Sequence, residues 1–474
     1  MTLPANTRWR TARASRASVV IDADNYFRAA WEAMQRARRQ ILLVGWDFDA
    51  RISLVFDDEE VVAPVTVGDF IGWLVDRTPG LEVYILRWDK GALKTLFRGK
   101  TLWTLTKWRF ARRRIHLKLD GHHPIAASQH QKIVVIDDSI AFCGGIDMTD
   151  ARWDTRDHRD DDVHRVTPRG KPYKPWHDAT TALEGPVAAA LGELCRERWR
   201  IAGGRPIHPP ARHGEGWPPS LTPDFTDIDV AISRTQPHCG DQPEVLEIEN
   251  LYVHLIARAR RRIYAESQYF ASRRVAEAIA ARLTEPDGPE IVIINPVVAQ
   301  GWLEPIAMDT ARARLFQALK QNDPHGRLRI YHPVTTSGRA IYVHAKVLVI
   351  DEEVVRVGSS NFNNRSLRLD TECDVTIVDD GARIAAIRDG LVAEHLGCDP
   401  ASIAADIAEH GLIATIEARR GGGHTLIPYE VPDLDDVQKW LADNEVLDPE
   451  GPTEMFEPLS KRGLLRRLRI RARD

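Results

Sequence analysis

One eight-residue pattern of reactive side chains, His-x-Lys-x-x-x-x-Asp, occurs twice in this chain of 474 residues. Its six fixed residues, the predicted catalytic set, are His130, Lys132, Asp137, His344, Lys346 and Asp351. A glycine-rich turn follows each copy, GGID from Gly144 and GSSN from Gly358, again 214 positions apart (358 − 144, as for 344 − 130). This regularity predicts two copies of one structural unit that share one site.

These residue types suit the cleavage of a phosphodiester. A neutral imidazole can attack phosphorus, and a second, protonated imidazole can give a proton to the leaving oxygen. Two ammonium groups can hold the non-bridging oxygens as charge develops. Backbone N–H groups of the glycine turns, with Ser359 and Asn361, can add phosphate contacts. The scheme requires no metal and no other cofactor.

Strand periodicity sorts the motif residues onto two faces. Side chains alternate along a strand, so His130 and Lys132 point to one face and Asp137 to the other. The same parity holds for the second copy. We therefore expect the two His–Lys pairs to carry the chemistry. Each motif aspartate is expected to support the site as a hydrogen-bonding or charge-pairing group.

A single histidine on an apolar strand is usually a packed core residue, so one copy of the motif would be weak evidence. Here two copies stand in register, each with the same downstream turn. Similar segments also precede them, ARRQILLVGWDF at 37–48 and ARRRIYAESQYF at 259–270. Agreement between motif and context favours a functional site.

The elements around the motifs predict an α/β fold. Apolar residues at helical spacing precede an apolar, buried-strand pattern in both halves. The expected helices are residues 27–37, 186–199, 251–259, 274–283 and 308–319. The further expected strands are residues 81–86, 290–294 and 328–331. Alternating strands and helices indicate a mixed sheet flanked by helices, built twice.

Composition shifts divide the chain. A segment rich in Pro and Gly, residues 204–223, separates a first half at 1–203 from a second half at 224–426. Residues 427–474 form a tail that is first acidic and then strongly basic with interleaved leucines. Two interpretations of this tail have equal support: an amphipathic segment at a membrane surface, and a solvated or disordered tail.

Bulk composition limits the classes of function. Hydrophobic residues make up 43% and charged residues 28%, as in ordinary globular proteins, and the net charge of −4 disfavours a chain dominated by nucleic-acid binding. The five cysteines are scattered without CxxC spacing, which disfavours a disulfide scaffold or a zinc site and favours a reducing compartment. The N-terminus lacks the apolar region of a secretory signal, and no stretch reaches the ~20 apolar residues of a membrane span. We expect a cytoplasmic protein that reaches lipid from the membrane surface.

The duplicated motif followed by G-S-x-N resembles the phospholipase D superfamily, over roughly residues 26–376. The stretches GSSNFNNRSLRLDTE, IYAESQYF, RWDTRDH and PWHDATTALEGP are most similar to eukaryotic-type members. The resemblance implies two α/β sandwich halves about a pseudo-twofold axis, with one metal-free site complete in one chain. It also implies a phosphohistidine on His130, with His344 as general acid and base. The residues alone permit the reverse assignment.

The resemblance further implies a carboxylate that orients the second-motif histidine. Glu372, 28 residues after His344 (372 − 344), is the candidate. At the same offset in the first half stands His158, which cannot act as an anion. We therefore expect Asp178, in the Trp-His-Asp element, to serve His130.

The two halves are not equivalent at the glycine turns. Gly145 and Asp147 stand in the first half where Ser359 and Asn361 stand in the second. We expect Asp147 to support the site or contact the phosphate. The site should therefore be used asymmetrically.

These observations favour a phospholipase D that acts on a phospholipid at a membrane surface. It would release phosphatidate and a head-group alcohol with water as acceptor, or transfer the phosphatidyl group to another alcohol. A cardiolipin synthase and a phosphodiesterase or nuclease are the alternatives, and a catalytically dead lipid-binding module is disfavoured by two intact motifs. The basic and aromatic segment at 96–114 suits a membrane boundary, a nucleic-acid patch or an amphipathic core helix. Nucleic acid is the disfavoured partner.

Overall fold

A computed structural model describes residues 2–56, 62–89, 113–125, 127–211, 216–298, 304–379 and 381–432. The basic and aromatic segment at 96–114 and the tail at 427–474 lie almost entirely outside these residues. Among the described residues, no helix is long and apolar enough to cross a membrane.

The first half runs from a short 3-10 turn, η1 (Ala5–Thr7), to a long helix. Its elements are β1 (Arg10–Ile21), α1 (Ala23–Met34), β2 (Gln40–Gly45), α2 (Val67–Arg77), β3 (Glu82–Trp88), β4 (Ile115–Asp120), β5 (Ile133–Ile136), β6 (Ile140–Gly144), β7 (Trp176–His177), β8 (Ala179–Glu184) and α5 (Pro186–Ile201). The predicted linker at 204–223 falls between α5 and the first strand of the second half.

The second half repeats this order with additions. Its elements are β9 (Phe225–Gln236), β10 (Val245–Leu246), α6 (Glu247–Arg258), β11 (Arg262–Glu266), α7 (Arg273–Leu283), β12 (Glu290–Ile294), α8 (Glu304–Gln321), β13 (Leu328–Val334), β14 (Tyr342–Val343), β15 (Val347–Ile350), β16 (Val354–Gly358), a π-helical turn η2 (Arg365–Leu369), β17 (Glu372–Val378), α9 (Ala382–Leu396), α10 (Pro400–His410), α11 (Leu412–Arg419) and β18 (Thr425–Pro428). The predicted helices and strands are therefore all present.

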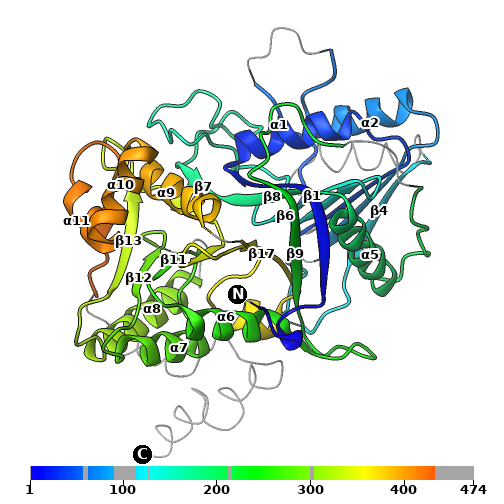
Figure 1. Ribbon diagram of the computed structural model, residues 1–474. Helices are drawn as coiled ribbons and strands as arrows, with labels where there is room; N and C mark the ends of the chain where they lie inside the picture. The colour runs from blue at the N-terminus through cyan, green and yellow to red at the C-terminus, as the bar shows by residue number, and fades with distance from the viewer. Residues whose placement is uncertain are drawn as a thin grey trace, which may run out of the picture.

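Sheet topology shows the duplication directly. The strand order reads β4-β3-β2-β5-β6-β8-β1 in the first half and β13-β12-β11-β15-β16-β17-β9 in the second. In each half three parallel strands lie next to antiparallel ones. The long strands β1 and β9 pair antiparallel at the centre, with Arg10 opposite Ile232 and Ala17 opposite Phe225 (Figure 1). The expected pair of mixed-sheet halves about a pseudo-twofold axis is confirmed.

Apolar side chains fill three layers. A central core draws on both halves and includes Val135 of β5, Val349 of β15, and one face each of α5 and α9. A second core lies under α1 and α2 of the first half, and a third under α6, α7 and α8 of the second. The predicted parity holds, because Ile133 and Val135 face the central core while Val134 and Ile136 face the outer one.

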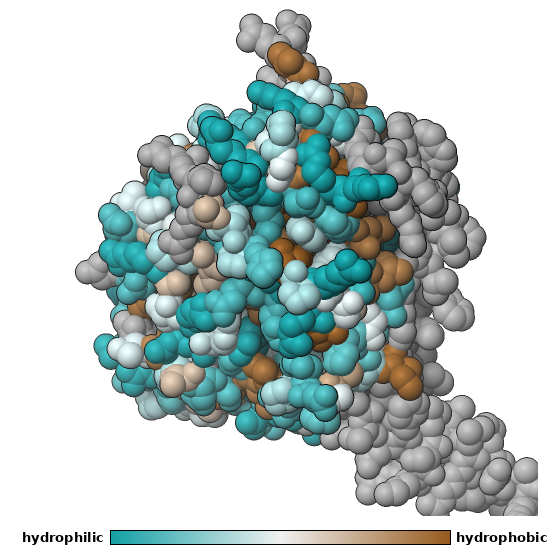
Figure 2. Space-filling model, turned by 90° about the vertical axis from the view of Figure 1, so that its right-hand side faces the viewer, coloured by the Kyte–Doolittle hydropathy of each residue, from teal (hydrophilic) through white to brown (hydrophobic). Residues whose placement is uncertain are grey.

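The molecular surface carries both hydrophilic and apolar residues, as is usual for globular proteins. Hydrophilic residues dominate the face shown in Figure 2, and apolar residues are scattered among them. Single exposed apolar residues are common on globular proteins. The fold therefore concentrates its apolar area in the layers between sheet and helices.

Candidate active site

Each motif ends in an aspartate that anchors a neighbouring strand. The Asp137 carboxylate accepts hydrogen bonds from three consecutive backbone N–H groups at 2.6–2.8 Å, and the Asp351 carboxylate does the same at 2.7–2.9 Å. The donors are Arg38, Arg39 and Gln40 for the first and Arg260, Arg261 and Arg262 for the second. Both aspartates also take left-handed backbone angles, which Asp tolerates better than most residues. Both aspartates therefore support the site as expected. The predicted catalytic set included them, but they are structural residues, because they bind the backbone of a neighbouring strand.

The motif histidines lie just before the regular strands. The motif pattern predicts one strand from the histidine onward, but β5 begins at Ile133 and β15 at Val347, three residues after the histidine. The reason is that the preceding backbone pairs with the opposite half. The His130 N–H donates to the carbonyl of Thr371 at 3.0 Å, and the His344 N–H donates to the carbonyl of His177 at 2.7 Å. Each histidine is thus held by the half that does not encode it.

This crossing decides which carboxylate orients which ring. Nδ1 of His130 lies 3.0 and 2.9 Å from the two carboxylate oxygens of Glu372. Nδ1 of His344 lies 2.7 Å from Oδ2 of Asp178. The predicted pairs, Glu372 with His344 and Asp178 with His130, are therefore wrong and must be exchanged.

Short parallel strand pairing is the physical cause of the exchange. β14 pairs in parallel with β7, Val343 opposite His177, so the next residues, His344 and Asp178, lie side by side. In the same way Gln129 pairs with Thr371, which places His130 beside Glu372. An offset counted along one half cannot reveal a pairing made between halves.

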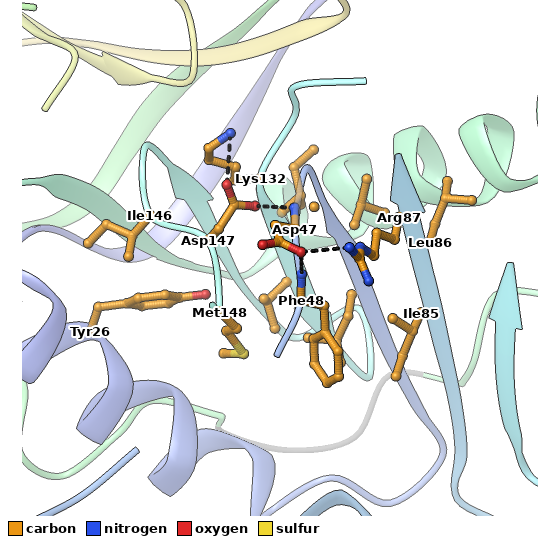
Figure 3. A pocket seen from close by; sticks show the side chains of 15 residues that line it. Tyr26, Asp47, Phe48, Ile85, Leu86, Arg87, Lys132, Ile146, Asp147 and Met148 are labelled. Carbon is orange, nitrogen blue, oxygen red and sulfur yellow. Dashed lines mark hydrogen bonds and ion pairs between the residues drawn. The ribbon is translucent and has the colours of Figure 1, made fainter. Parts of the chain in front are cut away.

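The two lysines have different surroundings. Nζ of Lys132 donates to the carbonyl of His130 at 3.0 Å and lies 3.2 Å from Oδ2 of Asp147. Figure 3 shows the contact of Lys132 with Asp147. Asp147 also accepts the backbone N–H of Trp46 at 2.9 Å. Lys346 donates to the carbonyl of His344. Asn361, at the position that matches Asp147 (361 − 147 = 214), cannot give Lys346 an anionic partner.

Ser359 and Asn361 occupy buried positions in the second glycine turn. The Ser359 hydroxyl donates to Glu372 and accepts the backbone N–H of Cys373 at 3.0 Å. It therefore holds the carboxylate that holds His130. The side-chain oxygen of Asn361 has no hydrogen-bond partner among the described residues, which leaves it able to accept one.

The first glycine turn packs against the second motif. A Cβ at Gly145 would lie 2.4 Å from Oδ1 of Asp178 and 3.4 Å from Cδ of Lys346. Only glycine leaves room for this approach. This contact explains why the turn of the first half has Gly145 where the second half has Ser359.

Burial and the lysines keep both rings neutral. Burial lowers the pKa of His130 well below its ordinary value, and the charges of Lys132 and Lys346 lower that pKa further. Burial and then Lys346 likewise lower the pKa of His344. A neutral imidazole whose Nδ1–H donates to a carboxylate has its lone pair on Nε2. Both rings can therefore offer Nε2 to phosphorus or to a proton.

The pKa values of three further buried groups are shifted. Burial lowers the pKa of the Lys346 ammonium to about 7 and raises the pKa of Glu372 to about 8. Burial would also raise the pKa of Asp178, but the charge and hydrogen bond of His344 and the charge of Lys346 hold that pKa at about 2. Strong shifts on several neighbouring buried groups are typical of catalytic sites.

Aromatic and basic residues that we did not predict complete the surroundings of His344. The Trp176 ring stacks on Tyr342, with centroids 4.7 Å apart, and its centroid lies 5.1 Å from that of His344. The guanidinium of Arg152 lies 4.2 Å from the Trp176 ring centre. Both Arg152 and Trp176 stand in segments whose family resemblance we had noted, RWDTRDH and PWHD, and that resemblance was the available signal.

A small cavity lies behind Lys132 and Asp147 (Figure 3). Its volume is about 20 Å³, room for about one water molecule. Tyr26, Phe48 and the buried ion pair of Asp47 with Arg87, 2.8 Å apart, contribute to its lining. The cavity is too small for a substrate. It is part of the packing around Lys132, which contributes to its lining.

Comparison with known proteins places this geometry in a family. A family model described as "Phospholipase D" matches residues 33–213, and one described as "Cardiolipin synthase, PLD-like domain" matches residues 252–389. Phospholipase D alpha 1 of Ricinus communis is 25% identical over 77% of this chain and 60% of its own length. Phospholipase D alpha 1 of Vigna unguiculata is 26% identical over 71% of this chain and 58% of its own length. The chain spans about three fifths of these relatives.

A solved structure shares the fold. The crystal structure of phosphatidylserine synthase from Haemophilus influenzae superposes with a TM-score of 0.57 at 13% identity, over 87% of this chain and 97% of that one. The two family models fall one on each half, and each covers one copy of the repeated motif. The chain belongs to the phospholipase D superfamily.

Proposed function

We propose that this chain is a phospholipase D, which hydrolyses the terminal phosphodiester of a glycerophospholipid to phosphatidate and a free head-group alcohol. One observation carries the proposal. Each motif histidine is oriented through Nδ1 by a buried carboxylate of the opposite half, at 2.7–3.0 Å, so that one site is assembled from both copies. Such a pair of oriented imidazoles suits a two-step displacement at phosphorus.

The reaction proceeds through a phosphohistidine. Nε2 of His130 attacks phosphorus, an N–P bond forms, and the P–O bond to the head group breaks as His344 gives its proton to the leaving oxygen. His344 then takes a proton from water, water attacks phosphorus, the N–P bond breaks, and phosphatidate leaves. An alcohol in place of water gives transphosphatidylation. The two lysines hold the non-bridging oxygens throughout.

The carboxylates support this division of roles. Asp178 favours the protonated form of His344 by charge and by hydrogen bond. A bound phosphodiester also brings a negative charge that offsets Lys346. Glu372 accepts the Nδ1–H of His130 and leaves Nε2 free to attack. We therefore keep His130 as the nucleophile and His344 as the general acid and base.

The proposed substrate is a phospholipid reached from a membrane surface, and the proposed location is the cytoplasm, with peripheral attachment. Two relatives are named phospholipase D alpha 1, which supports the lipid class. We also propose that one chain, with its halves at 1–203 and 224–426 and its linker between them, supplies the whole site. Water and small alcohols are the proposed acceptors.

A phosphatidyltransferase that uses another lipid hydroxyl as acceptor is the second candidate. The model that matches residues 252–389 is described by cardiolipin synthase, and this match favours that alternative over a nuclease. The two candidates share the phosphohistidine step and differ only in the acceptor.

One assay separates the candidates. Purified protein is incubated with phosphatidylcholine vesicles and ethanol, with and without EDTA, and phosphatidylethanol is measured. Its formation supports phospholipase D; its absence, with cardiolipin made from phosphatidylglycerol, supports the transferase. Cleavage of DNA without any lipid product would reject both.

The role of His130 has its own test. Wild-type protein is mixed with a lipid labelled in its head group and its phosphate, and the reaction is quenched rapidly. An acid-labile phosphoprotein should be recovered. His130→Asn should abolish this adduct. Activity of that variant should fall by about 10³-fold or more, the usual loss for a nucleophile. An undiminished adduct in His130→Asn would assign the nucleophile to His344.

A further inference from the structure

A second group of buried histidines and carboxylates lies directly behind the active site. Asp22, His158, His177 and Glu394 present ligand atoms that all lie within 4.8 Å of one another. Their side chains are 0–2% exposed. They come from the end of β1, the loop before β7, β7 itself and α9. Their link to the reacting residues runs through the backbone, since the carbonyl of His177 accepts the N–H of His344 at 2.7 Å.

The spacing of these atoms fits one tetrahedral ion. Nε2 of His158 lies 3.6 Å from Oδ2 of Asp22 and 3.3 Å from Oε1 of Glu394. Nδ1 of His177 lies 3.3 Å from Oδ1 of Asp22 and 2.8 Å from the same Glu394 oxygen. Tetrahedral ligands at about 2.0–2.1 Å from Zn²⁺ are about 3.3 Å apart.

The outer nitrogens of both histidines are already oriented. Nδ1 of His158 lies 3.0 Å from Oδ2 of Asp154, and Nε2 of His177 lies 2.8 Å from Oε2 of Glu266. A carboxylate that accepts the outer N–H of a histidine fixes the tautomer whose lone pair faces a metal. The inner nitrogens, Nε2 of His158 and Nδ1 of His177, both face the centre of the group, where Nε2 of His158 hydrogen-bonds Oε1 of Glu394 at 3.3 Å, so a bound cation would replace a proton there.

Two atoms at the centre have no hydrogen-bond partner. Oδ2 of Asp22 and Nδ1 of His177 are buried and make no hydrogen bond to the described residues. Oδ1 of Asp22 and Oε1 of Glu394 lie 3.3 and 2.8 Å from Nδ1 of His177 and hold the ring by charge. Buried polar atoms without partners are costly, and a cation between them would satisfy both.

His177 and its partner Glu266 have different residues at the matching places of the other half. Thr371 stands opposite Gln129 just before Glu372, as His177 stands just before Asp178, so Thr371 is the counterpart of His177. Strand register makes Val44 the counterpart of Glu266, since Val44 pairs with Ile133 and Glu266 with Val347. The duplicated fold alone therefore does not require these side chains.

We propose that Asp22, His158, His177 and Glu394 bind one divalent transition-metal ion, with Zn²⁺ the best match to the donor set and spacing. Two carboxylates would face the ion, of which Glu394 also pairs with Arg156 at 2.5 Å, and the two imidazoles would bind in their neutral form after losing a proton. Glu394 also lines a surface cavity of about 650 Å³.

The ion would be a structural support for the general acid and base. Asp22 accepts the backbone N–H of Asp178 through Oδ1 at 3.0 Å and donates its own N–H to the Asp178 carbonyl at 2.8 Å. Asp178 in turn holds His344. A fixed Asp22 and His177 thus fix the carboxylate between them, and no step of the proposed reaction passes through the ion.

Metal content tests the proposal without an activity assay. Full-length protein expressed with zinc is freed of loose ions and its metals are measured by elemental analysis; we expect about one Zn²⁺ per chain, as in a structural site. Protein stripped with chelator at mildly acidic pH and reloaded with Co²⁺ should show the intense visible absorption of tetrahedral Co²⁺. Its thermal midpoint should fall on stripping and recover on reloading.

Variants locate the ion. Asp22→Asn and His158→Gln should each lower bound zinc about tenfold or more, since a ligand is lost. His332→Gln is the matched control, because His332 is also buried but lies outside the group and hydrogen-bonds the carbonyl of Asn295 at 2.9 Å. If the ligand variants do not fold, the Co²⁺ spectrum of the wild type still decides. A folded wild type that binds neither Zn²⁺ nor Co²⁺, or ligand variants that keep the ion, would overturn the proposal.

Discussion

Lys346 is fully buried, and its ammonium has a pKa of about 7 for that reason. Its charge is present below that value and is lost as pH rises through it. Binding of an anionic phosphodiester should therefore weaken above about pH 7, and KM should rise there. Lys346→Arg keeps its charge at every accessible pH, so the rise in KM should begin at a higher pH. Its maximal activity should fall, because a planar guanidinium replaces a compact ammonium group. A pH profile of KM for both proteins checks this. If KM rises at the same pH in both proteins, the titration of Lys346 does not cause the rise.

Replacing Glu372 is expected to change stability and activity in opposite directions. Burial raises its pKa to about 8, above the ordinary value of 4.5. A raised folded-state pKa contributes stability below the unfolded value, and this contribution is lost as pH rises through about 8. Glu372→Gln should therefore be as stable as the wild type at about pH 4.5 and more stable at about pH 9, with the difference growing between about pH 4.5 and 8.

Activity of Glu372→Gln should fall by about 10²-fold or more, because a neutral amide is a weaker acceptor for the His130 Nδ1–H and its NH₂ group can face the ring and impose the wrong tautomer. Thermal melts at the two pH values, with activity measured beside them, separate the effects. A loss of melting temperature at alkaline pH would show that the ionised carboxylate stabilises the fold.

At the scale of elements, the glycine turn after β6 sets how closely the two motifs approach. The Cβ of Gly145→Ala would meet the Asp178 carboxylate at 2.4 Å. Asp178 must then move away from His344, and a displacement of about 1 Å in a catalytic group costs about 10² in rate. Gly422→Ala is the matched control, since a Cβ there meets no atom within 4 Å. Steady-state rates of both variants test this, and equal activity would show that the turn can give way.

The same elements show what the sequence could and could not reveal. Strands such as IVVI and VLVI were predictable because each is a short, fully buried apolar run, and the helices because their apolar spacing is regular. The exchange of carboxylates was not predictable, because His130 and Glu372 are 242 positions apart and meet through a single bridge between halves. The group around His177 was equally hidden, because its four members share no spacing motif.

At the scale of the whole molecule, the two halves share a core. The central layer takes residues from β5 and α5 of the first half and from β15 and α9 of the second. Across it, Sγ of Cys143 and Sγ of Cys373 lie 3.7 Å apart, and both cysteines are free. Neither half can bury its central face alone, so we infer that the halves fold as one unit.

A chain cut in the linker tests this. A cut after Pro210 lies between α5 and β9, and the pairing of β1 with β9 then has to form between fragments, as does the bond from the Trp217 N–H to Glu184 at 3.1 Å. We expect each fragment to be unfolded or aggregated when produced alone, because each exposes its share of the central core. Co-expressed fragments should associate and recover lipid-cleaving activity, since no catalytic residue lies in the linker. Near-ultraviolet circular dichroism and size-exclusion chromatography follow the folding. A well-folded, monomeric first fragment would show that the halves are independent domains, and the assembly of the site would then be a docking event and not part of folding.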